Sequence, residues 1–333
     1  MANNVDANDP ISLLHVTRRF GDVVAVDDVS FSLAPGTILG LIGPSGSGKT
    51  TILRMLTGSL APTNGEVRVL GEPPTRFRAR TRERIGYMPQ NFVLYPELTA
   101  SENLSFVGAL FGMYVLKRRR RVREVLELVD LWDVRDRRAS KLSGGMQRRL
   151  ALAAAFVHEP EILFIDEPTA GIDPILRARI WEELRRQAAE GRTFIVTTQY
   201  VGEAEHCDGV ALLAGGELLA LNSPAELRHE VYGGDILDVR THREFDARSL
   251  EGVPGVLSAK QRGPRGVIVV TEDAGATTPR IVEAVQRSAD EVAFIDQYEP
   301  SFDELFVQLV QRREAERGRA VQDARAGGTG RAA

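Results

Sequence analysis

The chain has 333 residues, of which 43% are hydrophobic and 26% charged, as expected for a soluble globular protein of about two domains. Its formal net charge of −4 argues against a dedicated nucleic-acid binder, whose domain is usually basic. The single cysteine, Cys207, excludes a disulfide framework and favours a reducing cytoplasm, and no apolar run is long enough to span a membrane.

Strands alternate with helices over the first two thirds of the chain. The expected strands are 11–20, 23–33, 36–42, 84–89, 161–166, 193–198 and 209–221. The expected helices are 49–56, a mainly helical stretch over 99–141 with Ser101 as N-cap, and 174–191, which begins at Pro174 and ends at Gly191. This alternation predicts an α/β fold with a largely parallel sheet.

The pattern changes at the glycine-containing stretch 231–235. Short strands are expected beyond it at 236–240, 256–260, 266–270 and 292–296, with helices at 277–288 and 301–313. We therefore expect a small α+β domain over 235–313, joined to the first by a glycine hinge. Residues 1–10 are expected to be flexible, and the Arg-, Ala- and Gly-rich residues 314–333 disordered.

The stretch "GPSGSGKT" follows a predicted strand, opens a predicted helix and fits the phosphate-loop pattern G-x-x-x-x-G-K-[ST]. Its glycines allow backbone N–H groups to surround phosphate oxygens, Lys49 can reach the β- and γ-phosphates, and the Thr50 hydroxyl can bind Mg²⁺. The expected ATP-binding residues are Phe20, Gly43, Pro44, Ser45, Gly46, Ser47, Gly48, Lys49, Thr50 and Thr51. A mere tight turn is the alternative.

A second acidic motif, "ILFIDEP", ends an apolar strand in Asp166 and Glu167. Beside a phosphate loop, Asp166 is expected to hold Mg²⁺ directly or through water. Glu167 lies one residue farther out, where it can polarise an attacking water. The alternative is a solvated acidic pair at a strand end.

A third motif, "LSGGMQ", opens an apolar helix with Ser143, Gly144 and Gly145. This helix start is a second anion site, yet one nucleotide triphosphate needs only one. A head-to-tail pair of chains explains both, because the Ser143 loop of one copy then closes on the nucleotide held by Lys49 of the other. An ordinary N-capped helix is the alternative.

These motifs, in this order, resemble the ATP-binding subunit of an ABC transporter over roughly residues 11–230. The match also includes Gln90 after "YMP", Asp173 in "AGID", and Phe20. The resemblance implies a P-loop ATPase cassette over 11–232, with parallel-sheet core, antiparallel β and helical subdomains, and the helical subdomain at about 99–158.

The resemblance also assigns roles to single residues. Phe20 falls where an aromatic ring stacks on adenine, although it can equally be a core phenylalanine. Gln90 falls where a glutamine touches Mg²⁺ and the attacking water, and Asp173 where an aspartate lies at the dimer seam. The implied cofactors are ATP and Mg²⁺, and the implied partners are a second copy and an integral membrane permease, at the cytoplasmic face of the membrane.

Gln199, in "TTQYVGEAE", falls where most of the family has a histidine that contacts the γ-phosphate. Its amide can donate to a phosphate oxygen and accept from water, but it cannot become a cation or shuttle a proton. We expect hydrolysis to persist, with Glu167 as base and Gln199 as a positioner, because Lys49, Gln90 and Asp166 are all present. The alternative is impaired hydrolysis, with binding alone as the function.

The same stretch and the terminal "EPSFDELFVQL" are similar to the daunorubicin-resistance branch, which exports drugs and antibiotics with separate ABC-2-type permeases. Exporters of lipid, polysaccharide or peptide share much of this pattern. A soluble ABC ATPase acting on ribosomes or DNA is a further alternative. It is disfavoured by the single phosphate loop and by the absence of sustained heptads in the sequence.

Overall fold

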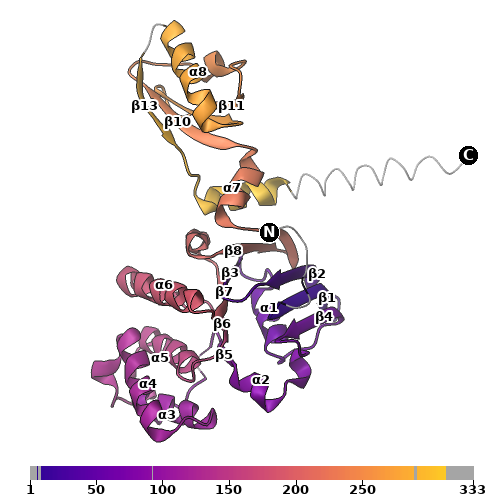
Figure 1. Ribbon diagram of the computed structural model, residues 1–333, viewed down its shortest axis with the longest axis vertical. Helices are drawn as coiled ribbons and strands as arrows, with labels where there is room; N and C mark the ends of the chain where they lie inside the picture. Colours follow the sequence, from indigo (N-terminus) through magenta and orange to yellow (C-terminus); the bar gives the residue numbers. More distant parts are fainter. Residues whose placement is uncertain (1–5, 7–8, 92, 289–290, 313–333) are drawn as a thin grey trace, which may run out of the picture. The chain divides into compact units, whose positions relative to one another are not determined.

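The computed structural model describes residues 6, 9–91, 93–288 and 291–312. The chain divides between Ser223 and Pro224 into two compact units, each described here by itself (Figure 1). The expected disordered tail at 314–333 lies outside the described residues, as does most of the expected flexible segment 1–10. Within the described ranges, no helix is both long enough and apolar enough to cross a bilayer.

The division lies upstream of the expected glycine hinge. Helix α7 (Pro224–Tyr232) falls within the first domain expected from the sequence but groups with the second unit. Its Arg228 donates to the Pro300 carbonyl at 3.2 Å and lies 4.8 Å over the Phe302 ring. These contacts to residues far along the chain fix α7 to the second unit.

A six-stranded sheet in the order β5-β6-β7-β3-β8-β9 forms the centre of the first unit (Figure 1). Its strands are β3 (Ile38–Ile42), β5 (Ile85–Met88), β6 (Ile162–Asp166), β7 (Thr193–Thr198), β8 (Gly209–Ala214) and β9 (Glu217–Asn222). All neighbouring pairs are parallel except the β8–β9 hairpin. Every residue of β3, β6 and β7 is buried, which explains their largely apolar sequences. The predicted parallel α/β core is confirmed.

A second, antiparallel sheet has the order β2-β1-β4. Its strands are β1 (Ile11–Phe20), β2 (Val23–Leu33) and β4 (Asn64–Val69). The sequence does not predict β4, because only Val67 and Val69 of its six residues are buried. Helix α1 (Lys49–Leu56) buries Ile52, Leu53 and Leu56 in the apolar core that this sheet shares with the larger one.

The helical part of this unit contains α3 (Ala100–Leu110), α4 (Val115–Leu128) and α5 (Gly144–Phe156), which lie together in Figure 1. The remaining helices are α2 (Ala79–Glu83) and α6 (Pro174–Ala189). The expected N-cap Ser101 is wrong. Thr99 caps α3, since its hydroxyl accepts from Glu102 N at 3.1 Å and Glu102 accepts from Thr99 N at 2.8 Å.

The second unit is built on an antiparallel sheet in the order β11-β12-β10-β13. Its elements after α7 are β10 (Asp235–Thr241), β11 (Val256–Gln261), β12 (Gly266–Thr271), α8 (Ala274–Arg287) and β13 (Val292–Gln297), followed by helical residues 302–312. Ile281 and Val285 of α8 pack with Val239 and Val269 in one core. Helix α8 begins three residues before the expected 277, because Asp273 caps it by accepting from Ala276 N.

Candidate active site

The phosphate loop joins the buried strand β3 to α1. Gly48 is the N-cap residue of α1 with φ 102°, a left-handed conformation that favours glycine. A Cβ atom at Gly43 would lie 2.1 Å from the Leu213 carbonyl oxygen, so no larger residue fits there. Pro44, Ser45 and Gly46 are exposed at the apex of the loop, and Thr50 and Thr51 lie in the first turn of α1. The local structure is thus a strand, a glycine turn and a helix start.

Lys49 is buried under this loop. Its Nζ donates to the Gly43 and Pro44 carbonyl oxygens at 2.6 and 2.9 Å. Burial lowers the pKa of Lys49, while the nearby carboxylates of Glu167 and Asp166 oppose that shift. The ammonium group therefore has two carbonyl acceptors and two carboxylates around it, and a phosphate oxygen can replace the carbonyls.

Asp166, the last residue of β6, is buried and held at one oxygen only. Its Oδ1 accepts from Thr197 Oγ1 at 2.5 Å and from Thr50 Oγ1 at 3.4 Å. Its Oδ2 is buried without a hydrogen-bond partner among the described residues. A buried, unpartnered carboxylate oxygen beside a threonine hydroxyl fits a hard cation such as Mg²⁺. The sequence does not identify Thr197.

Glu167 follows in a strained backbone conformation with φ 54°. Its N–H donates to the Thr197 carbonyl and hydroxyl oxygens at 3.1 and 3.0 Å, which hold this conformation. Its Oε2 accepts from Gln90 Nε2 at 3.3 Å and lies 3.8 Å from Arg148 Nη2. The structure thus brings Gln90 and Glu167 together as expected positions of one site, and adds Arg148, which the sequence does not indicate.

The other expected positions lie on exposed ends of elements. Gln199 is exposed directly after β7, and Phe20 ends β1 with 46% of its surface exposed, under the Arg18 guanidinium at 4.6 Å. Phe20 is therefore not a core residue. Within the described part of the chain, neither residue has a hydrogen bond to Lys49 or Asp166.

Ser143 and Asp173 both act as helix N-caps. Ser143 Oγ accepts from Met146 N at 3.3 Å at the start of α5, and Asp173 Oδ1 accepts from Leu176 N at 3.0 Å at the start of α6. Both caps are exposed. A Cβ atom at Gly144 would meet nothing within 4 Å, and one at Gly145 would lie 3.5 Å from the Gly171 carbonyl oxygen. Gly144 therefore faces open space, and the Ser143 and Asp173 caps lie on the surface.

Arg177 and Glu203 form a further pair that the sequence does not indicate. Arg177, in α6, donates to the Ile172 carbonyl at 3.4 Å, lies 5.3 Å from the Tyr200 ring and is 3.8 Å from Glu203 Oε1. Glu203 belongs to the 3-10 helix η4 (Val201–His206) and is 4% exposed. The pair therefore ties the segment before α6 to the segment that follows Gln199.

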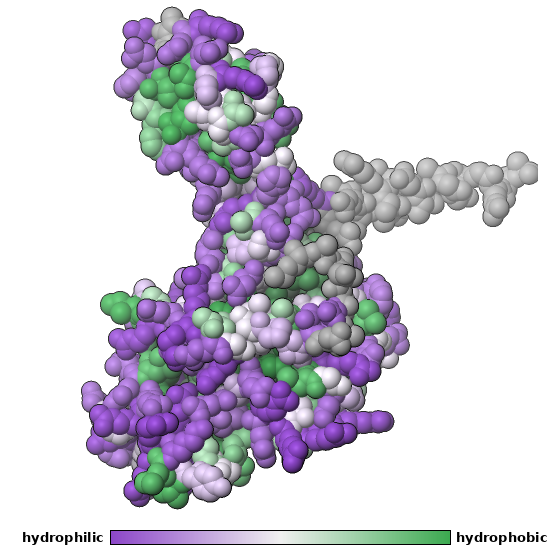
Figure 2. All heavy atoms as spheres, viewed as in Figure 1, coloured by the Kyte–Doolittle hydropathy of each residue, from purple (hydrophilic) through white to green (hydrophobic). Residues whose placement is uncertain are grey.

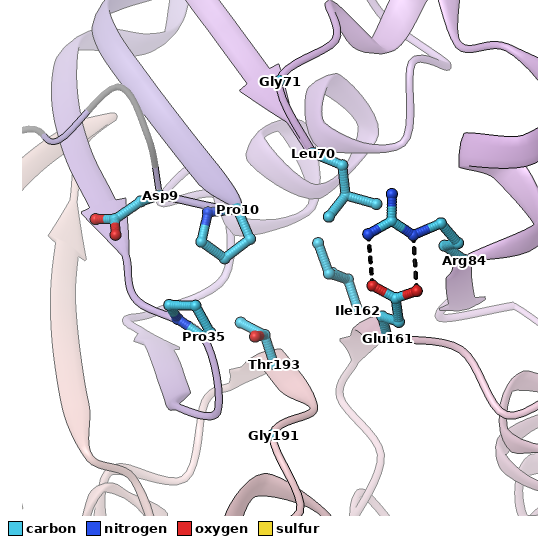
Figure 3. A pocket seen from close by; sticks show the side chains of 10 residues that line it. All are labelled: Asp9, Pro10, Pro35, Leu70, Gly71, Arg84, Glu161, Ile162, Gly191 and Thr193. Atoms are coloured by element: carbon cyan, nitrogen blue, oxygen red, sulfur yellow. Dashed lines mark hydrogen bonds and ion pairs between the residues drawn. The ribbon is translucent and has the colours of Figure 1, made fainter.

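A cavity of about 500 Å³, shown in Figure 3, lies away from all of these residues. Ile162 and Thr193, the first residues of β6 and β7, line it, whereas the expected site residues follow the carboxyl ends of those strands. Arg84 makes two hydrogen bonds to Glu161 there, at 2.7 and 2.6 Å, and they lower the pKa of Glu161. In open parallel sheets ligands bind at the carboxyl edge, so this cavity is not the nucleotide site.

Two family models match the chain. The model described as "ABC transporter" matches residues 26–170, and the one described as "ATP-binding protein DrrA1-3-like, C-terminal domain" matches residues 223–310.

Relatives with assigned names match as well. The chain is 41% identical over 273 residues to the Nod factor export ATP-binding protein I of Bradyrhizobium diazoefficiens, covering 79% of this chain and 89% of that protein. It is 38% identical over 218 residues to the probable multidrug ABC transporter ATP-binding protein YbhF of Escherichia coli. That match covers 66% of this chain but only 38% of YbhF.

Solved structures support the same assignment. A dimeric, post-hydrolysis ATP-binding cassette, MJ0796 bound to ADP and Pi, is 29% identical with a TM-score of 0.60, over 64% of this chain and 98% of that one. An ATP-binding subunit of an ABC transporter has a TM-score of 0.62 at 25% identity, over 66% and 92%. The chain therefore belongs to the ATP-binding subunits of ABC transporters, which bind and hydrolyse ATP to power transport across a membrane.

Proposed function

We propose that two copies of this chain hydrolyse ATP at a shared seam, with Mg²⁺, to drive a separate membrane exporter. The observation that carries the proposal is the arrangement around Asp166. Its unpartnered oxygen lies beside the Thr50 hydroxyl, and the next residue, Glu167, is held by Gln90. The residues proposed to bind the cation (Asp166), the phosphates (Lys49) and the attacking water (Glu167) thus lie together at the edge of one sheet.

Thr50, Asp166 and Gln90 would hold the magnesium ion, which neutralises charge on the β- and γ-phosphates when bound. Lys49 would exchange its loop carbonyls for phosphate oxygens. Glu167 would accept the proton of the attacking water, or orient that water. Gln199 would donate an amide hydrogen bond to the γ-phosphate without supplying charge.

The second half of the site would come from the partner copy through Ser143, Gly144, Gly145 and Asp173. Support comes from the exposure of Ser143, Gly144 and Asp173 and from the open space at Gly144. A serine hydroxyl can accept from the Met146 N–H and still donate its own hydrogen to a phosphate oxygen. Ser143 can therefore cap α5 and bind the partner's nucleotide at once. The similar cassette MJ0796 is dimeric with ADP and Pi bound, which supports a nucleotide-bound dimer here.

The exporter itself would be an integral membrane permease of the ABC-2 type, with this subunit at the cytoplasmic face of the membrane. The helical part of the first unit supports such docking, because it exposes apolar side chains where α3 leads into α4. Leu110 is 68%, Tyr114 85% and Leu116 81% exposed. Figure 2 shows hydrophobic atoms at that edge of the molecule. Exposed clusters of this kind are typical of interaction sites.

We infer a drug or antibiotic as cargo. The multidrug name of YbhF and the DrrA-like model over the second unit support this class. The Nod factor export relatives instead favour the alternative that the cargo is not a drug. Lipid or polysaccharide is the alternative class expected from the sequence. Transport assays with the permease in vesicles, comparing a panel of drugs with such molecules for stimulation of ATP turnover, distinguish the two.

The shared dimer interface is tested with Glu167→Gln. This variant should bind ATP but hydrolyse it at least about 100-fold more slowly than the wild type. With ATP and Mg²⁺ this variant should become a dimer in size-exclusion chromatography with light scattering. Adding Ser143→Asp should keep the α5 cap but abolish the dimer, since a carboxylate cannot donate to phosphate and repels it. A Glu167→Gln variant that stays monomeric, alone and with its permease, would disprove the shared site.

Turnover assigns the roles of the two residues nearest the attacking water. Gln199→Ala should lower kcat about 10-fold, because it removes one neutral hydrogen bond to the transition state. Glu167→Gln should lower it much further. If Glu167→Gln retains the wild-type rate, Glu167 is not the base.

A further inference from the structure

Arg148 belongs to α5, the helix that Ser143 caps. We call the start of this helix, Ser143 to Gly145, the Ser143 tip. Arg148 nevertheless contacts Glu167 and Ala170 of its own chain. Its Nη2 lies 3.8 Å from Glu167 Oε2, and its Nη1 donates to the Ala170 carbonyl oxygen at 3.4 Å. The side chain is 21% exposed and that of Glu167 is 15% exposed. Arg148 therefore bridges α5 to the segment between Glu167 and the Asp173 cap.

The guanidinium group is poorly satisfied in this position. Its Nε and Nη2 are buried without a hydrogen-bond partner among the described residues, and its one hydrogen bond is long. Charge-assisted N–H···O bonds to a carboxylate are normally about 2.7–2.9 Å long. A shift of α5 by about 1 Å would convert the 3.8 Å ion pair into such a bond. The observed contact is thus one step short of its optimum.

Both donors near Glu167 approach the same oxygen. Gln90 Nε2 donates to Oε2 at 3.3 Å, and Arg148 Nη2 faces that oxygen too. Gln90 is thus the only one of the two within hydrogen-bond distance of Oε2, and Arg148 lies just beyond it among the described residues. Arg148 is the only one of the two that is carried by the helix of the partner-binding tip.

We propose that Arg148 is a positioning residue that couples the Ser143 tip to Glu167 of the same chain. This inference rests on the shared dimer site proposed above. When the tip engages the partner's nucleotide, α5 brings Arg148 into direct contact with Glu167 and orients its carboxylate for the attacking water. Each copy then hydrolyses its own ATP fastest when its Ser143 tip is bound to the nucleotide held by the partner copy.

The test uses dimers in which only one copy can hydrolyse. A limiting active copy is mixed, free of nucleotide, with a tenfold excess of Glu167→Gln copies, and phosphate release in the first turnover is measured after adding ATP and Mg²⁺. Arg148→Gln is placed either on the active copy, in cis to the intact Glu167, or on the excess copy, whose tip closes on the active nucleotide.

The cis arrangement should slow the first turnover about 10- to 100-fold, the range expected for a misplaced catalytic group, with little change in the ATP concentration at half-maximal rate. Arg148→Gln on the excess copy should slow the first turnover less than about 3-fold. Three outcomes would overturn the proposal. The first turnover could slow equally in both arrangements, slow only when the excess copy carries Arg148→Gln, or not slow in either. Arg148→Lys in cis should regain several-fold of the lost rate, and a lysine variant as slow as the glutamine variant contradicts the need for charge.

Arg149→Gln is the matched control, because Arg149 lies next in the same helix but donates to the Val129 and Asp130 carbonyls instead. It should show no selective slowing in cis. Ser143→Asp on the excess copy tests the dimer separately and should abolish the first turnover. If it does not, the shared site fails irrespective of Arg148. Far-UV circular dichroism and thermal unfolding of each variant confirm that the fold is intact.

Discussion

Arg177 and Glu203 offer a sharp test of how this fold tolerates a buried carboxylate. Glu203 is 4% exposed, and both its carboxylate oxygens are buried without a hydrogen bond in the described part of the chain. Arg177 is its only described ion-pair partner, at 3.8 Å, and 32% of that side chain remains exposed. Removing one partner should therefore have a very different effect from removing the other.

Arg177→Met leaves a buried, uncompensated carboxylate and should lower the free energy of unfolding by about 3–5 kcal/mol. Glu203→Met leaves Arg177 partly exposed to water and still hydrogen-bonded to the Ile172 carbonyl. It should therefore lower the free energy of unfolding by only about 1–2 kcal/mol. The double variant should cost about 2 kcal/mol, less than Arg177→Met alone, because apolar side chains of similar volume replace the pair. The coupling energy, which is the sum of the two single costs minus the cost of the double variant, is then about 2–5 kcal/mol.

Urea unfolding followed by Trp181 fluorescence measures these values, in a background where Trp132 is replaced by phenylalanine. Trp181 is buried and stacks on His206, three residues after Glu203, at 5.1 Å between ring centroids. It therefore reports on this part of the first unit. If Glu203→Met is the more costly single change, or if the double variant is as unstable as Arg177→Met, the asymmetric desolvation argument is wrong.

Three further results are expected. Gly43→Ala should abolish ATP binding and lower the melting temperature, because its Cβ would lie 2.1 Å from the Leu213 carbonyl; unchanged binding in a calorimetric titration contradicts this. Burial lowers the pKa of His158 to about 4, so below pH 6.5 the unfolded chain binds a proton that the folded chain does not. Stability should fall as pH falls from 6.5 to 4, and His158→Phe should flatten that slope in urea unfolding at a series of pH values. Cys207 should resist a thiol reagent until urea unfolds the chain, because burial raises the pKa of its thiol, and rapid labelling of the native protein would refute this.

The sequence predicts well those features that depend on neighbours along the chain. The apolar runs of β3, β6 and β7 locate the parallel sheet, because strands buried on both faces leave a continuous signal. The glycine loop before α1 is equally local, since its backbone conformation demands glycine at Gly48. Fold class and phosphate loop therefore follow from the sequence alone.

Features that depend on contacts across the chain do not. Ser101 and Thr99 are both plausible caps for α3, two residues apart, and only the reciprocal bond with Glu102 selects Thr99. Thr197 reads as an ordinary strand residue until β6 and β7 pair and bring it to Asp166. Arg148 lies among several arginines in the sequence, and nothing local marks it as the one that faces Glu167.

The two halves of the proposed site differ in how firmly the chain holds them. Lys49, Asp166 and Thr197 are buried and fixed by hydrogen bonds inside one copy, so a single chain can bind the nucleotide's phosphates with little rearrangement. Ser143 and Asp173 are exposed helix caps. In the proposed dimer they would meet a nucleotide only when a second copy arrives. Affinity for ATP should therefore depend mainly on one chain and hydrolysis on two. In the proposed dimer, ATP would link the two copies, and its cleavage would remove the phosphate contacts that favour the closed pair.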